Sequence, residues 1–164
     1  MRVTAKEDST RTGTAPRPAS GPCSATLALG DDGAAIARAR HFAVDFLTRV
    51  QAEYGLPVSR RAMDLTQLVV SELVTNARKY APGPALLDLG IAGDTVDISV
   101  WDSDPVLPVP RAADADRVGQ HGLEIVLAVV QSYEVRREPV GKRVSARIAL
   151  ADDPGGAVTG RPPL

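Results

Sequence analysis

The feature that most restricts the fold of this chain is a change in the period of its apolar residues near position 84. Before that point, apolar side chains recur every three or four residues, as they do on one face of an amphipathic helix. After it, the segments 85–92 and 95–102 alternate apolar and polar residues, as strands do when they bury one face. Helices that precede a cluster of strands predict a layered α+β fold rather than repeated β-α-β units.

Turn-forming residues set the limits of the two long predicted helices. Asp31 or Asp32 is placed to cap the first helix, which stops at the Gly55 turn. The second helix opens at Ser59 and stops before Pro82.

The remaining elements follow from the same signals. Strands are predicted at 25–30, 85–92, 95–102, 133–139 and 142–150, a further helix at 123–131, and a long loop at 103–121. We expect this loop to be a mobile lid, because it has three prolines, no regular period and flanking glycines. The elements together predict a two-layer α+β sandwich with a mixed, mostly antiparallel sheet that is covered on one face by helices.

The two ends of the chain differ in composition from its centre. Residues 1–22 and 153–164 are rich in Ser, Thr, Pro and Gly and have few apolar anchors, so we expect disordered tails. Residues 23–152 then form one domain, which is long enough to bury a core.

Charge and cysteine content exclude several classes of function. The formal net charge is −1, from 19 basic and 20 acidic side chains, with no basic patch for nucleic acid or for a membrane surface. Cys23 is the only cysteine, which excludes an internal disulfide framework. Without an apolar run of membrane-spanning length or a signal-peptide core, we expect a cytoplasmic protein.

Two polar residues interrupt the apolar stripe of the second helix, in the stretch SELVTNARKYA at 71–81. Glu72 and Asn76 are one turn apart and fall among the stripe residues Leu65, Leu68, Val69 and Leu73. An unpaired polar group in such a position costs roughly 1–3 kcal/mol. We therefore expect another part of the chain, or a ligand, to supply their partners.

Two later features point to the same ligand. Asp102 shares the inward parity of its strand and has no evident mate, and Gly119 and Gly122 bracket the entry to the short helix. Free backbone N–H groups at a helix start suit a phosphate, and glycine permits close approach. A metal-bound nucleoside triphosphate would satisfy the Glu72–Asn76 pair, the strand-end carboxylate and the glycine-flanked helix start.

Three stretches carry a family resemblance. SELVTNARKYA resembles the N-box of the GHKL ATPase superfamily (Bergerat fold), WDSDP occupies the place of the first Gly-motif, and GQHGLEIV resembles the second. Residues 25–150 are similar to the anti-sigma-factor serine/threonine kinases, which are stand-alone histidine-kinase-like ATPase domains. The resemblance implies ATP and Mg²⁺ as cofactors, and a sigma factor or an anti-sigma-factor antagonist as partner. It leaves open whether the chain forms a homodimer.

The resemblance also implies roles for individual residues. Glu72 would orient or deprotonate the attacking hydroxyl, Asn76 would bind Mg²⁺, and Asp102 would accept a hydrogen bond from the adenine amino group. Gly119, Gly122 and the backbone at Leu123 would cap the phosphates.

Two further side chains lie near these positions. Lys79 is within reach of the Asn76 face, and His121 is at the helix start. Each is either a phosphate contact or a solvated side chain.

The chain departs from the family pattern at three places. The Asp-x-Gly-x-Gly motif is DSDPV at 102–106, Tyr80 replaces a frequent histidine, and Arg143 stands where we expect a base-contacting threonine. The missing glycines favour a non-catalytic module that acts only by sequestering a regulator, whereas the intact Glu72–Asn76 pair favours a kinase. A sensor histidine kinase is a weaker alternative, because we see no dimerisation and phosphoacceptor helix before the domain.

Overall fold

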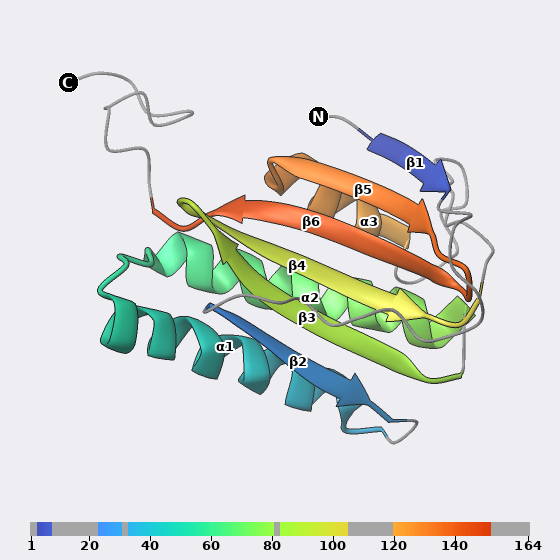
Figure 1. The fold of residues 1–164 in the computed structure, drawn as a ribbon, viewed down its shortest axis with the longest axis horizontal. Coiled ribbons are helices and arrows are strands. Elements are labelled where there is room, and N and C mark those ends of the chain that lie inside the picture. The colour runs from blue at the N-terminus through green and yellow to red at the C-terminus, as the bar shows by residue number, and fades with distance from the viewer. Residues whose placement is uncertain (1–2, 8–22, 31–32, 81–82, 105–119, 152–164) are drawn as a thin grey trace.

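The sheet and the helices form two layers. The computed structural model describes residues 3–7, 23–30, 33–80, 83–104 and 120–151. Within these ranges, three helices cover one face of a six-stranded sheet (Figure 1). The elements are β1 (Val3–Glu7), β2 (Ser24–Leu29), α1 (Ala35–Tyr54), α2 (Arg60–Tyr80), β3 (Ala85–Ala92), β4 (Thr95–Asp102), α3 (Gln120–Val129), β5 (Ser132–Arg137) and β6 (Lys142–Ala149).

The sheet is mixed and mostly antiparallel, as the sequence predicts. Its strand order is β1-β5-β6-β4-β3-β2, and only β1 pairs with its neighbour in parallel. Gly93 allows the tight β3–β4 turn because it adopts a φ of 63°. The predicted α+β sandwich is therefore confirmed.

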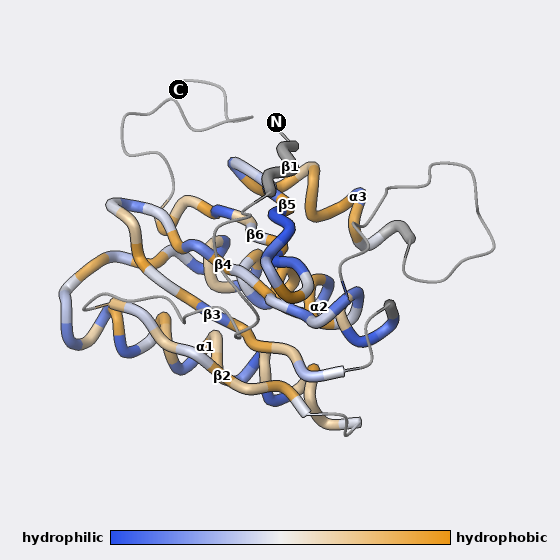
Figure 2. Tube along the Cα trace, turned by 45° about the vertical axis from the view of Figure 1, so that its right-hand side comes forward, coloured by the Kyte–Doolittle hydropathy of each residue, from blue (hydrophilic) through white to orange (hydrophobic). Residues whose placement is uncertain are grey.

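The core lies between the sheet and the helices. Inward-facing side chains of the strands include Leu87, Leu89, Val96, Ile98, Val144 and Ile148, all buried. Figure 2 shows α3 almost entirely in hydrophobic colours, whereas α1 and α2 carry both kinds of residue in turn. Two-sided helices cover the sheet with one face and meet water with the other. Helix α3 buries Leu123 and Val126 in the core, while its apolar residue Ile125 is exposed.

Capping at the helix ends agrees with the sequence except at the start of α1. Ser59 accepts a hydrogen bond from the Ala62 backbone N–H through its Oγ (2.9 Å), which caps α2. Gly55 ends α1 with a φ of 67°. Helix α1 begins only at Ala35, with Ala34 at the N-cap and no side-chain cap; Asp31 and Asp32 lie outside the described residues.

Two other predicted limits were wrong. Val3–Glu7 forms β1 beside β5, inside the segment that we expected to be a disordered tail, because its backbone pairs with the free edge of β5. Helix α3 begins at Gln120 rather than at Leu123, which shortens the predicted 103–121 loop. Residues 105–119, 8–22 and 152–164 lie outside the described part of the chain, and with them the predicted lid and most of the tails.

Candidate functional site

The predicted site residues come from elements that meet at one end of the molecule. In the sheet, Asp102 at the end of β4 is paired with Ala85 on one side and Lys142 on the other. Helix α2 ends at Tyr80, only a few residues before β3 begins, so its last turns lie at the same end (Figure 1). The ends of α2 and β4 and the start of β6 thus frame the candidate site.

Glu72 and Asn76 lie at the border of the buried face of α2, not in its middle as we expected. The buried residues of α2 are Ala62, Thr66, Val69, Val70, Leu73, Val74 and Ala77. Glu72 and Asn76 are half-buried, as are Leu65 and Leu68. The apolar face is therefore rotated relative to the predicted stripe, and the polar pair is partly open to solvent.

Neither polar side chain has a protein partner among the described residues. The Glu72 carboxylate and the Asn76 amide make no side-chain hydrogen bond or ion pair there. Burial raises the pKa of the Glu72 carboxyl above its usual range. The predicted protein partners are absent from the described residues, so a carboxylate and an amide about 6 Å apart along the helix can still bind a ligand.

The Glu72 carboxylate lies against the first turn of α3. A Cβ atom built on Gly122 would overlap this carboxylate, with Oε1 at 2.9 Å. Only a glycine lets the two elements approach so closely while the Glu72 side chain keeps this position. The structure therefore brings together the Glu72 and Gly122 that the sequence places fifty residues apart.

The backbone of this turn has free donors. The N–H groups of the N-cap and of the first three residues of a helix have no intrahelical acceptor, and in α3 these include the N–H group of Gly122. The Leu123 side chain is buried in the core. Its N–H is at the position where Arg38 in α1 and Met63 in α2 donate to the carbonyl before the helix, so the predicted backbone contact at Leu123 is not among the free donors. Gly119 and the His121 side chain lie outside the described residues.

Asp102 does have a mate, contrary to expectation. The Lys142 ammonium donates to Asp102 Oδ1 at 3.0 Å and to the Asp104 carbonyl at 3.0 Å. The Asp104 backbone N–H also donates to Asp102 Oδ1, at 2.9 Å. The two side chains of this ion pair are 5% and 2% exposed, so the pair is desolvated.

The environment of Asp102 has two opposing effects. Burial raises the pKa of the Asp102 carboxyl, and the hydrogen bond and charge of Lys142 offset part of that rise. The second oxygen, Oδ2, is the atom through which this carboxylate can accept a bond from a ligand.

Gly141 allows the backbone to pack tightly beside Asp102. It has a φ of 77°, and a Cβ at this position would overlap the Asp102 carbonyl oxygen and approach Ser103 Cα to 2.8 Å. The motif DSDPV has no glycine, but the glycine of the neighbouring hairpin supplies close approach to the same turn.

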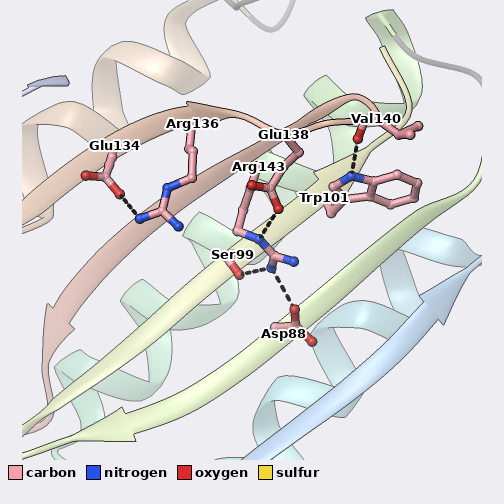
Figure 3. Close-up of polar contacts among 8 residues, drawn as sticks. All are labelled: Asp88, Ser99, Trp101, Glu134, Arg136, Glu138, Val140 and Arg143. Atoms are coloured by element: carbon pink, nitrogen blue, oxygen red, sulfur yellow. Dashed lines mark hydrogen bonds and ion pairs between the residues drawn. The ribbon is translucent and has the colours of Figure 1, made fainter. Parts of the chain in front are cut away.

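Arg143, which stands in the place of the expected threonine, does not face the candidate base position. It lies on the sheet face opposite the helices, where it contacts Asp88 at 2.7 Å, Ser99 at 2.9 Å and Glu138 at 3.6 Å (Figure 3). Its register partner Trp101 also faces outward and donates to the Val140 carbonyl at 2.8 Å. Strand parity therefore turns Lys142, not Arg143, towards Asp102.

Lys79 and the predicted Mg²⁺ site remain to be placed. Lys79 is exposed in the last turn of α2 and has interactions with neighbouring residues. No group of three or more His, Cys, Asp or Glu side chains in the described ranges is arranged to hold a metal ion. A single protein ligand, such as the amide predicted at Asn76, is compatible with Mg²⁺, which commonly takes most of its ligands from phosphates and water.

Sequence reasoning missed Lys142 and Gly141, although a signal was present. In KRVSARIAL, Lys142 shares the parity of Val144, Ala146 and Ile148, which marks it as inward-facing.

The fold and these side chains define a nucleotide-binding α+β domain. The family model described as histidine kinase-like ATPase domain matches residues 31–148, more than half of the chain. The chain belongs to this family, and it is therefore an ATP-binding domain. No curated protein matches the chain. Among the described residues, no helix has the length and apolar character needed to cross a membrane.

Proposed function

We propose that this chain is a cytoplasmic Mg-ATP-dependent protein serine/threonine kinase of the anti-sigma-factor kind. It would phosphorylate an anti-sigma-factor antagonist, sequester a sigma factor, or do both. The observation that carries the proposal is the position of the Glu72 carboxylate, which lies against Gly122 at the start of α3 without a partner among the described residues.

Glu72 suits a base that acts on a hydroxyl beside the γ-phosphate. Burial moves the pKa of the Glu72 carboxyl towards neutral pH, and a general base is most effective when its pKa is near the working pH. In the transfer, the serine Oγ forms a bond to the γ-phosphorus while the bond to the β,γ-bridging oxygen breaks. The hydroxyl proton passes to Glu72 and ADP leaves.

Asn76 and the first turn of α3 suit the phosphates. The Asn76 oxygen can serve as the protein ligand of Mg²⁺, while the N–H group of Gly122 donates to a phosphate oxygen. Bound Mg²⁺ would neutralise the charge that develops on the transferred group. The chain's own residues then hold the phosphates, orient the acceptor and receive its proton.

The class of acceptor rests on the resemblance of SELVTNARKYA and GQHGLEIV to the anti-sigma-factor kinases. The net charge of −1 supports a protein partner rather than nucleic acid.

A second candidate is a non-catalytic module that only sequesters its partner. The observation that favours it is the closed state of the base position, where Asp102 is 1% and Lys142 is 4% exposed. Such a module would keep the fold and the nucleotide pocket without transferring phosphate.

Phosphoryl transfer separates the two candidates. Wild-type protein, γ-labelled ATP, Mg²⁺ and a candidate antagonist are incubated, and phosphoserine or phosphothreonine is located by mass spectrometry. We expect transfer by the wild type and a loss of about 10²-fold or more in Glu72→Gln, with ATP affinity largely retained.

Glu124→Gln is a matched control, because Glu124 is an exposed carboxylate in α3, two residues after Gly122. It should transfer phosphate at the wild-type rate. Partner binding without transfer in the wild type would replace the kinase with the sequestering module.

A further inference from the structure

The buried Lys142–Asp102 pair needs an explanation beyond stability. Taking two charges out of water is costly, and apolar residues of similar volume usually serve stability as well or better. Both side chains are almost fully covered. A pair of this kind at the edge of a candidate binding site is better explained by the geometry that it imposes.

The contacts of Lys142 define that geometry. Its Nζ bridges the Asp102 side chain and the Asp104 carbonyl, so one ammonium group ties the carboxylate to the turn that follows it. The Asp104 N–H closes the turn onto the same carboxylate oxygen. Both bonds end on Oδ1, which fixes the carboxylate orientation, and no group in the described part of the chain donates to Oδ2.

We propose that Lys142 is the positioning residue of the base-binding site. Its ammonium group holds Asp102 and the 102–104 turn in the geometry in which Oδ2 accepts a hydrogen bond from the 6-amino group of adenine. Lys142 thereby fixes the backbone of the DSDPV segment, which has no glycines to shape it. The inference rests on the proposed ATP site and assigns its base selectivity to a lysine on β6.

The charge of Lys142 also affects the pH range in which Asp102 is ionised. Asp102 must be ionised to accept a strong charge-assisted bond. Among the described titratable groups, those that act on Asp102 are Lys142, which lowers its pKa, and Asp104, which raises it. Without Lys142, only the Asp104 backbone N–H opposes burial and the Asp104 charge, so the pKa of the Asp102 carboxyl rises and the carboxylate protonates at a higher pH.

The test measures affinity for ATP and for purine riboside triphosphate, which lacks the 6-amino group, by calorimetry across pH 5–8. We expect the wild type to prefer ATP by about tenfold or more, the usual effect of a hydrogen bond to a charged group. Lys142→Met should lose most of this preference, and the acidic limit of its remaining ATP binding should move to higher pH. Arg143→Met, which removes the neighbouring charge on the outer face, should keep the preference.

Lys142→Arg keeps the charge and serves if the methionine variant does not fold. It should show an intermediate preference, because a planar guanidinium cannot reproduce both short contacts of the ammonium group. A Lys142 variant that folds and keeps the full preference for ATP would overturn the inference. A variant that binds ATP more tightly would also overturn it, because Lys142 would then be a competitor of the base. If the wild type bound neither nucleotide, the proposed function would fall together with the inference.

Discussion

Gly141→Ala adds a single methyl group beside the turn that carries Asp102, and it should affect both the stability of the fold and the affinity for ATP. Alanine at this position has to adopt a φ near 77°, and its Cβ overlaps the Asp102 carbonyl. The first effect costs about 1–2 kcal/mol. The second is an overlap with backbone, which cannot rotate away, and overpacking of this kind typically adds about 1–3 kcal/mol.

Gly93 provides a matched control. It has a φ of 63° in the β3–β4 turn, but a Cβ there meets no atom within 4 Å. Gly93→Ala should therefore cost only the conformational part. Alanine also makes the unfolded chain less flexible, which offsets part of this cost. The net loss in the free energy of unfolding is about 1 kcal/mol, or about 2–4 °C in Tm for a domain of this size.

The comparison of the two variants gives the expected result. We expect Gly141→Ala to lower the free energy of unfolding by about 2–4 kcal/mol, or about 4–16 °C in Tm, measured by chemical and thermal denaturation. ATP affinity should fall in the folded Gly141→Ala protein and stay unchanged in Gly93→Ala. Equal losses of stability in both variants would refute the close contact between Gly141 and the Asp102 backbone.

Three other substitutions test the site and its surroundings. Glu72→Gln removes a carboxyl whose pKa is raised by burial, so its ionised form is disfavoured in the folded protein. The wild type therefore loses stability as pH rises through the folded-state pKa of Glu72. The variant should have a higher Tm than the wild type at pH 8 and a smaller advantage at pH 4, and a lower Tm at pH 8 would indicate a structural pair instead. Gly122→Ala should stabilise α3 by about 0.5–1 kcal/mol in a Glu72→Ala background and by less in the wild type; equal effects would exclude the contact between the two residues. Arg143→Met should leave Asp88 buried without its cation and destabilise the fold by about 3 kcal/mol, with ATP affinity unchanged; weaker ATP binding would show that Arg143 affects the base site.

Periodicity was sufficient to predict the layers and most of the elements. Helices α1 and α2 and the strands β3 and β4 follow from local patterns whose period is set by backbone geometry. Strand β1 could not be found in this way, because its pairing with β5 is a long-range contact that leaves no mark in the composition of 1–22. The start of α3 was missed because Gly122 is a poor helix residue locally, so the pattern placed the helix start after it.

The site was only partly predictable. The inward parity of Asp102 was correct, but its partner depends on which residue of β6 lies opposite it, and that register is set by the whole β4–β6 pairing. A shift of one residue would place Arg143 instead of Lys142 opposite Asp102. Family resemblance placed the motif by sequence order, whereas the register decides which face each side chain occupies.

The Mg²⁺ dependence of ATP affinity in the wild type and in Asn76→Ala tests the central claim most directly. Calorimetric titrations with and without Mg²⁺ measure it, while circular dichroism confirms that both proteins are folded. We expect the wild type to bind ATP more tightly with Mg²⁺, and Asn76→Ala to bind it equally with and without the ion. A variant that keeps the full Mg²⁺ dependence, or a wild type that does not bind ATP, would contradict the assignment of the Glu72–Asn76 face of α2 to the nucleotide phosphates.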